Sequence, residues 1–189
     1  MNSEGRHVLT EVLSIPMKHG VAIDGGAHRG TWSLELASKF SKVIAFEPEP
    51  ANFKSLYWNT RHLDNVHRIQ KALGWVTEHK VKLAWRLDGK SDTTRINERG
   101  EPAIITSLDK ENIKNVSFIK LDLEGFEYFA LRGGEGLLRQ QKPLVLIEEK
   151  DGLSEYYGVP TGEARSWLKH IGMIELAKFK IDVLLGWPN

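Results

Sequence analysis

Short apolar runs alternate with longer amphipathic stretches along the first half of the chain. The runs 21–23 and 43–46 are continuous and apolar, as is typical of buried strands. The stretches 31–40 and 51–63 space their apolar residues at near-helical intervals. This strand-helix-strand-helix pattern predicts parallel strands joined by right-handed crossovers.

The rest of the chain continues the pattern less regularly. Further strands are expected over 66–73, 80–87, 104–108, 116–121 and 144–147. Helices are expected over 126–138, with an interruption at Gly133-Gly134, and over 161–170, and a polar loop over 88–100. The runs 174–177 and 183–185 predict an antiparallel hairpin at the sheet edge. The sequence therefore predicts one doubly wound α/β domain.

Composition narrows the possible chemistry. The chain has 189 residues, a length that favours one domain over 1–189, in which we expect residues 1–18 to form a short helical extension. It has no cysteine, which excludes disulfides, thiolate metal sites and a cysteine nucleophile. Its formal net charge is +1, which argues against a nucleic-acid partner. No secretory signal or membrane-spanning run is evident, so we expect a cytoplasmic protein without membrane attachment.

A glycine-containing turn, Ile23–Thr31, follows the first predicted strand. Ligands approach the backbone at this point of a doubly wound sheet. A dinucleotide would require glycines at i, i+2 and i+5, here positions 25, 27 and 30, but position 27 is Ala27.

Two carboxylates near this turn favour S-adenosylmethionine over a dinucleotide. Asp24 precedes the glycines, where it would favour a cationic ligand and repel a pyrophosphate. Glu47 closes the second strand and is placed to bind a ribose diol. The alternative is a tight strand-to-helix turn with an exposed carboxylate and no ligand.

A second acidic segment follows the strand 116–121. If the strand continues, Asp122 and Glu124 point to the same side, which favours an active-site role. Glu127 lies one helical turn further and is better explained by the positive end of the next helix.

From about residue 21 to 149 the chain resembles FkbM-type S-adenosylmethionine-dependent methyltransferases. The segments that carry the resemblance are IDGGAHRGTWS, AFEPEPANFKSLYWN, NVHRIQKALG, ITSLDK, FIKLDLEGFEYFALRGGEGLL and KPLVLIEE. The resemblance implies a Rossmann-like class I methyltransferase sheet with strand order 3-2-1-4-5-7-6 and strand 7 antiparallel. It also implies methyl transfer to a hydroxyl oxygen of a sugar, polysaccharide or small-molecule natural product.

Site residues follow from the two segments and the resemblance. The residues predicted to bind S-adenosylmethionine are Asp24, Gly26, Ala27, His28, Gly30, Glu47, Pro48, Ala72 and Asp122. The residues predicted to act in catalysis, with a general base among them, are Asp122, Glu124 and Glu148. Glu148 and Glu149 are adjacent on a strand and face opposite sides, so we predict no metal.

Other functions remain open at this level. They are a nucleic-acid methyltransferase, an NAD-dependent Rossmann oxidoreductase and a non-catalytic cofactor-binding domain. We expect a small-molecule or glycan acceptor. The short chain leaves an acceptor site that is either shallow or completed by a second subunit in a homodimer. The basic residues around 61–71 are interpreted as a solvated face.

Overall fold

The computed structural model describes residues 3–15, 18–75, 79–85, 94–96 and 101–188. Its α-helices are α1 (Ser3–Ser14), α2 (Thr31–Ala37), α3 (Pro50–Thr60), α4 (Leu108–Glu111), α5 (Glu127–Arg132), α6 (Glu135–Gln141) and α7 (Glu163–His170), and a 3₁₀-helix, η1, spans Ser154–Tyr157. Within these described ranges no helix is both long and apolar enough to cross a lipid bilayer.

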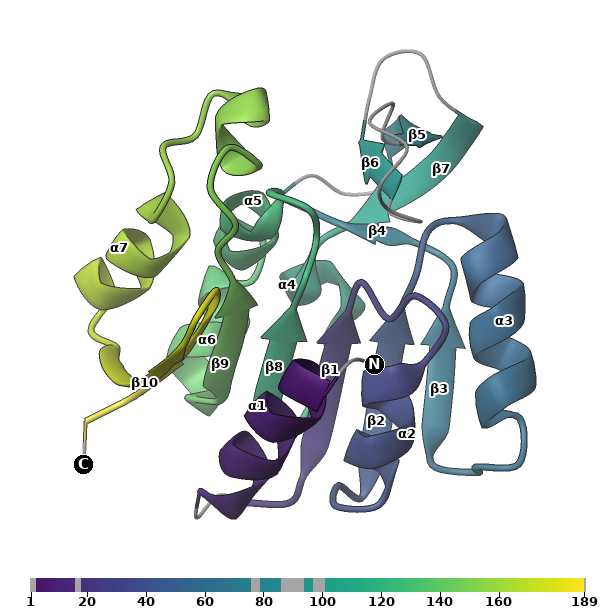
Figure 1. Ribbon diagram of the computed structural model, residues 1–189, viewed down its shortest axis with the longest axis horizontal. Coiled ribbons are helices and arrows are strands. Elements are labelled where there is room, and N and C mark those ends of the chain that lie inside the picture. The colour runs from purple at the N-terminus through teal and green to yellow at the C-terminus, as the bar shows by residue number, and fades with distance from the viewer. Residues whose placement is uncertain (1–2, 16–17, 76–78, 86–93, 97–100, 189) are drawn as a thin grey trace.

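Seven strands form the main sheet, in the order β10-β11-β9-β8-β1-β2-β3 (Figure 1). They are β1 (Val21–Gly25), β2 (Lys42–Phe46), β3 (Val66–Ile69), β8 (Val116–Leu121), β9 (Leu144–Glu148), β10 (Ile174–Phe179) and β11 (Asp182–Gly186). Numbered within this sheet alone, the order is 3-2-1-4-5-7-6, and β11 is antiparallel to both β9 and β10. The predicted fold class, strand order and edge hairpin are confirmed.

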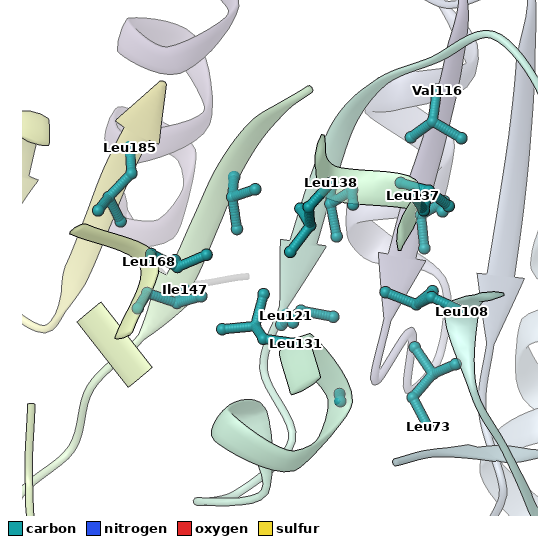
Figure 2. Packing of buried hydrophobic residues seen from close by; sticks show 14 of the residues in the cluster. Leu73, Leu108, Val116, Leu121, Leu131, Leu137, Leu138, Ile147, Leu168 and Leu185 are labelled. Carbon is teal, nitrogen blue, oxygen red and sulfur yellow. The ribbon is translucent and has the colours of Figure 1, made fainter. Parts of the chain in front are cut away.

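Helices cover both faces of the main sheet. Strand residues alternate between the faces, so Ala22 packs with core residues of α1, α2 and α3, whereas Ile23 packs with those of α4 to α7. Figure 2 shows part of the second layer, with Leu121 close to Leu131 of α5 and Ile147 close to Leu168 of α7. The two apolar layers hold the strands rigidly, and the loops at their ends take their positions from this core.

A second, four-stranded sheet corrects the expected course of the middle of the chain. It has the order β4-β7-β5-β6 and comprises β4 (Ala72–Leu73), β5 (His79–Trp85), β6 (Thr94–Ile96) and β7 (Glu101–Thr106). The strand predicted over 66–73 is wrong because the chain turns after β3, where the Lys71 amide donates to the Ile69 carbonyl oxygen (3.0 Å). The two halves therefore belong to different sheets.

Several other boundaries differ from the prediction. The strand expected over 104–108 ends at Thr106, because the Ser107 hydroxyl accepts a hydrogen bond from the Lys110 amide and caps α4. Part of the loop expected over 88–100 is strand β6, and its remaining residues, 88–93 and 97–100, lie outside the described residues. The interrupted helix expected over 126–138 is two helices, α5 and α6, separated at Gly133-Gly134.

Candidate functional site

The candidate site lies at the carboxyl ends of β1, β2, β8 and β9. In Figure 1 these four strands point to the same edge of the sheet, and the second sheet lies beyond that edge. The crevice outside the carboxyl ends of parallel strands is where open α/β sheets bind ligands. Most of the predicted site residues belong to the loops at this edge.

The glycine turn packs tightly against the loop that follows β8. Gly26 has a positive φ of 71°, and a Cβ atom added to it would lie 2.0 Å from the Asp122 carbonyl oxygen. The Asp122 amide in turn donates to the Gly25 carbonyl oxygen (3.1 Å). Gly30 also has a positive φ (88°), and a side chain there would collide with Leu56 of α3. Glycine at both positions is therefore required by the protein's own packing.

Asp24 lies near the end of β1, and its contact with a cofactor stays a prediction. Its side chain is fully buried, because strand alternation directs it to the face covered by α2. One carboxylate oxygen accepts a hydrogen bond from the Ser33 hydroxyl (2.6 Å), and the other lies 3.6 Å from the Lys120 ammonium group. Asp24 therefore contacts Ser33 of α2 and Lys120 of β8.

Glu47 follows β2 and contacts the glycine turn. Its two carboxylate oxygens accept hydrogen bonds from the backbone amides of His28 (2.7 Å) and Glu49 (2.9 Å). Burial raises its pKa to about 7, although both amide hydrogen bonds oppose this shift. His28 holds a left-handed backbone conformation at φ 51°, which places its amide at Glu47.

The remaining predicted cofactor residues differ in their access to solvent. Ala27 and Ala72 are buried, at 4% and 5% exposed, and Ala27 packs into the core beneath α2 and α3. Pro48 is partly exposed next to Glu47. Contact of these residues with a cofactor remains a prediction.

The structure brings the three predicted catalytic carboxylates together. Asp122, Glu124 and Glu148 each offer a carboxylate oxygen within 4.8 Å of the other two. The Lys150 ammonium group pairs with Glu148 (2.7 Å) and lies 3.9 Å from Glu124. Glu124 has a positive φ of 54°, a conformation that costs free energy in a residue other than glycine and is common at functional sites.

Two members of this cluster have pKa values that are shifted in opposite directions. Burial and the nearby Asp122 carboxylate raise the pKa of Glu148 to about 9. Burial also acts to raise the pKa of Asp122, but Lys120 and a hydrogen bond from Glu148 outweigh it and lower the pKa. These opposite shifts favour the protonated form of Glu148 next to the ionised form of Asp122.

These carboxylates are near enough to one another to share a cation. Lys150 already neutralises part of their charge, and one of the three carboxyls holds a proton. The expectation of no metal stays a prediction.

Glu127 serves the loop rather than the cluster. Its carboxylate accepts hydrogen bonds from the amides of Leu123 (2.6 Å) and Gly125 (3.3 Å) at the start of α5. Glu149, which follows β9, pairs with Arg165 of α7 (3.4 Å). The contacts of Glu127 agree with the structural role expected for it from the sequence.

A small hollow, open to solvent, lies next to the carboxylate cluster. Its wall is polar and apolar in about equal parts, and its hydroxyl, carboxylate and ammonium groups come from α5, the end of β9 and the segment that leads to α7. These lining groups include Tyr128, Glu148, Lys150, Ser154 and Thr161.

Sequence reasoning missed two lysines of the site, Lys120 and Lys150. Lys120 lies in β8 and is only 4% exposed, and Lys150 follows β9. A lysine in an otherwise apolar strand, two residues before Asp122, was a signal that the sequence offered. Its partner Asp24 lies in β1, however, and sequence spacing does not reveal this contact.

The raised pKa values predict how stability depends on pH. The pKa is about 7 for Glu47 and Glu127 and about 9 for Glu148, against an ordinary value of 4.5. Between about pH 4.5 and 9 the folded protein therefore binds more protons than the unfolded chain. Its free energy of unfolding should fall as pH rises. The decline is up to about 1.4 kcal/mol per pH unit for each group that is protonated in the folded protein and ionised in the unfolded chain.

Urea unfolding at pH 5, 7 and 9 measures this decline. Glu127→Gln keeps an acceptor for the amides but removes one titrating group, so it should flatten the curve between about pH 4.5 and 7. Stability that rises from pH 5 to pH 9 in the unsubstituted protein would contradict these pKa shifts.

Comparisons with solved structures agree with this fold. An FkbM methyltransferase from Methylobacillus flagellatus superposes with a TM-score of 0.60 at 18% identity, over 90% of this chain. This chain spans only 44% of the length of that protein. An rRNA methylase from Streptococcus thermophilus matches with a TM-score of 0.62 at 11% identity, over 100% of this chain and 99% of its own.

A third structure with this fold was solved with a ligand. The N-methyltransferase NodS from Bradyrhizobium japonicum, in complex with S-adenosyl-L-homocysteine, matches with a TM-score of 0.51 at 11% identity, over 98% of this chain and 86% of its own. At these identities the three matches establish the fold alone.

Sequence comparison places the chain more narrowly. No curated protein matches it. The family model described as the methyltransferase FkbM domain matches residues 24–174, a range that includes both acidic segments and every predicted site residue. The chain therefore belongs to the FkbM methyltransferase domain family.

Proposed function

We propose that this protein is an S-adenosylmethionine-dependent methyltransferase that methylates a hydroxyl oxygen of a small molecule or glycan. The observation that carries this proposal is the carboxylate cluster of Asp122, Glu124 and Glu148 beside the glycine turn. Membership of the FkbM family and the S-adenosyl-L-homocysteine held by NodS support the choice of cofactor.

The charges around the glycine turn fit this cofactor. Asp24, Glu47 and Asp122 surround the turn with carboxylates, of which Asp122 has a side chain that is 34% exposed. A pyrophosphate would be repelled by these groups, whereas a sulfonium and an ammonium group would be attracted. Asp122 is placed to bind the cationic end, and the carboxylate of Glu47 retains lone pairs for a ribose diol.

Each carboxyl of the cluster then has a distinct part in the reaction. S-adenosylmethionine, when bound, supplies a methyl group on a sulfonium. Glu148, whose raised pKa favours its protonated form, would orient the neighbouring Asp122 carboxylate. Glu124 is the general base, because its carboxylate belongs to the cluster and faces Lys150 at 3.9 Å, which moderates its charge. Its role would be to take the proton of the acceptor hydroxyl while the bond between that oxygen and the methyl carbon forms, the methyl–sulfur bond breaks and S-adenosylhomocysteine leaves.

The lining of the neighbouring hollow favours a hydroxyl-rich acceptor. Ser154, Thr161 and Lys150 offer hydrogen bonds there, as a sugar or a polyol requires when it leaves water. The chain lacks the cysteine needed for methylation of cytosine carbon, and Leu123-Glu124-Gly125 stands where amino-methylating enzymes carry a Pro-Pro-aromatic clamp. These features argue for oxygen as the methylated atom.

Calorimetric titration with S-adenosylhomocysteine tests the cofactor. We expect saturable binding with one site per chain and no binding of NAD under the same conditions. Absence of binding by the folded protein, or tighter binding of NAD, would contradict the proposal.

An acceptor screen tests the reaction. The protein is incubated with S-adenosylmethionine that carries a labelled methyl group and with separate glycan, small-molecule and RNA fractions of a cell extract. We expect label in a glycan or small-molecule fraction, in a linkage that resists hydrolysis as a methyl ether does. Label confined to RNA would overturn the proposed acceptor and favour the nucleic-acid alternative.

A further inference from the structure

Lys120 is a buried lysine at the centre of the site. It lies in β8 between the buried residues Ile119 and Leu121, and strand alternation directs it toward α2, where its ammonium group is 6.0 Å from the centre of the Trp32 ring. A buried ammonium group costs considerable free energy unless it is paired. We therefore expect negatively charged or polar groups around the Lys120 ammonium group.

Three groups, from β1, the glycine turn and the segment after β8, surround the Lys120 ammonium group. Its Nζ lies 3.6 Å from a carboxylate oxygen of Asp24, 3.6 Å from one of Asp122, and 3.3 Å from the Gly26 carbonyl oxygen, to which it donates a hydrogen bond. Burial acts to lower the pKa of Lys120, but Asp122, Asp24 and the more distant Glu148 and Asp182 outweigh it and raise the pKa. The lysine is therefore charged.

The three groups belong to both halves of the proposed cofactor site. Asp24 and Gly26 form the end of β1 and the glycine turn, whereas Asp122 follows β8 and faces the carboxylate cluster. The glycine turn and the segment after β8 make two other contacts. They are the hydrogen bond from the Asp122 amide to the Gly25 carbonyl oxygen and the close approach of Gly26 to the Asp122 carbonyl oxygen. Among the described residues, Lys120 has a charged side chain that contacts both of these segments.

We propose that Lys120 is a positioning residue for the cofactor site. It holds the glycine turn and the Asp122 carboxylate at the relative positions that a cationic cofactor requires. This inference rests on the proposed function. With Asp24 and Asp122 ionised, the three side chains together carry one net negative charge, which is complementary to a cofactor with one net positive charge.

The competing explanation is that Lys120 only neutralises the buried Asp24. Both explanations predict that Lys120→Met alone is unstable, because it leaves the Asp24 carboxylate buried without a cation. The double variant Asp24→Asn/Lys120→Met separates them. It removes both buried charges together, keeps the Ser33 contact available, and leaves the net charge of the three side chains at minus one.

The experiment measures the affinity for S-adenosylhomocysteine by calorimetry and folding by urea unfolding. We expect the double variant to fold with a urea midpoint near that of the unsubstituted protein and to bind about tenfold or more weakly, because the turn and Asp122 are no longer fixed relative to each other. Lys178→Met, on the exposed side of the edge strand β10, is the matched control and should leave both measurements unchanged.

The outcomes distinguish the two proposals. A double variant that is folded and binds within about twofold of the unsubstituted protein would overturn the positioning role of Lys120. If the double variant does not fold, Asp24→Asn/Lys120→Leu offers the same charges with different packing, and the same criterion applies to it. Failure of the unsubstituted protein to bind S-adenosylhomocysteine would instead reject the proposed function.

Discussion

Replacing Gly26 by alanine should abolish measurable binding of S-adenosylhomocysteine. The new Cβ atom would lie 2.0 Å from the Asp122 carbonyl oxygen, far inside van der Waals contact, so the glycine turn and the loop after β8 must separate. The left-handed backbone adds about 1–2 kcal/mol, and the collision adds about 1–3 kcal/mol or more, since backbone rather than a flexible side chain must move. Calorimetry and urea unfolding measure both consequences.

Gly152→Ala is the matched control for this substitution. Gly152 has a similar positive φ (79°), but a Cβ atom there has no neighbour within 4 Å. This variant should lose only the backbone contribution of about 1–2 kcal/mol and bind S-adenosylhomocysteine normally. Equal losses of stability and binding in the two variants would show that the approach of Gly26 to Asp122 has no special part in the site.

Glu124→Gln should reduce turnover by about two to four orders of magnitude, the usual contribution of a general base. Glutamine has nearly the same shape and keeps a hydrogen-bond acceptor, but it cannot take the proton of the acceptor hydroxyl. Because Asp122 and the glycine turn are unchanged, the affinity for S-adenosylhomocysteine should remain within about twofold of the original. Rates are measured with the acceptor that the labelling screen identifies.

Glu35→Gln is the control for the loss of a carboxylate, because Glu35 is exposed on α2. It should leave both rate and affinity unchanged. Full activity of Glu124→Gln would exclude Glu124 as the base. A loss of rate accompanied by an equal loss of cofactor affinity would assign Glu124 to binding instead.

Much of the fold follows from local sequence pattern. The apolar runs at 21–23, 43–46, 116–121 and 144–147 are strands of the main sheet because continuous apolar segments suit strands that are covered on both faces. The strand order came from the FkbM-type motifs. The second sheet was missed because its strands β4 and β6 are short, and their pairing joins segments that carry no distinctive pattern.

The candidate site was predicted in part. The sequence pointed to Asp122, Glu124 and Glu148 as a group, and the structure places their carboxylates together, since the ends of adjacent parallel strands meet at one edge. It also pointed to Asp24 as a cofactor-binding residue. The structure buries its side chain against Ser33 and Lys120, and contact with a cofactor stays a prediction. Spacing indicates which side chains share a face of a strand, but it does not tell which helix covers that face.

The sequence by itself determined the doubly wound fold and the two acidic segments, because periodicity and turn residues act over a few neighbouring positions. The tertiary structure alone decided the partners of Lys120, which lies 94 positions from Gly26 in the chain and 3.3 Å from its carbonyl oxygen. It also decided that the pKa of Glu148 is raised while that of Asp122 is lowered. Such shifts depend on burial and on distances between strands, and these quantities exist only after the sheet has assembled.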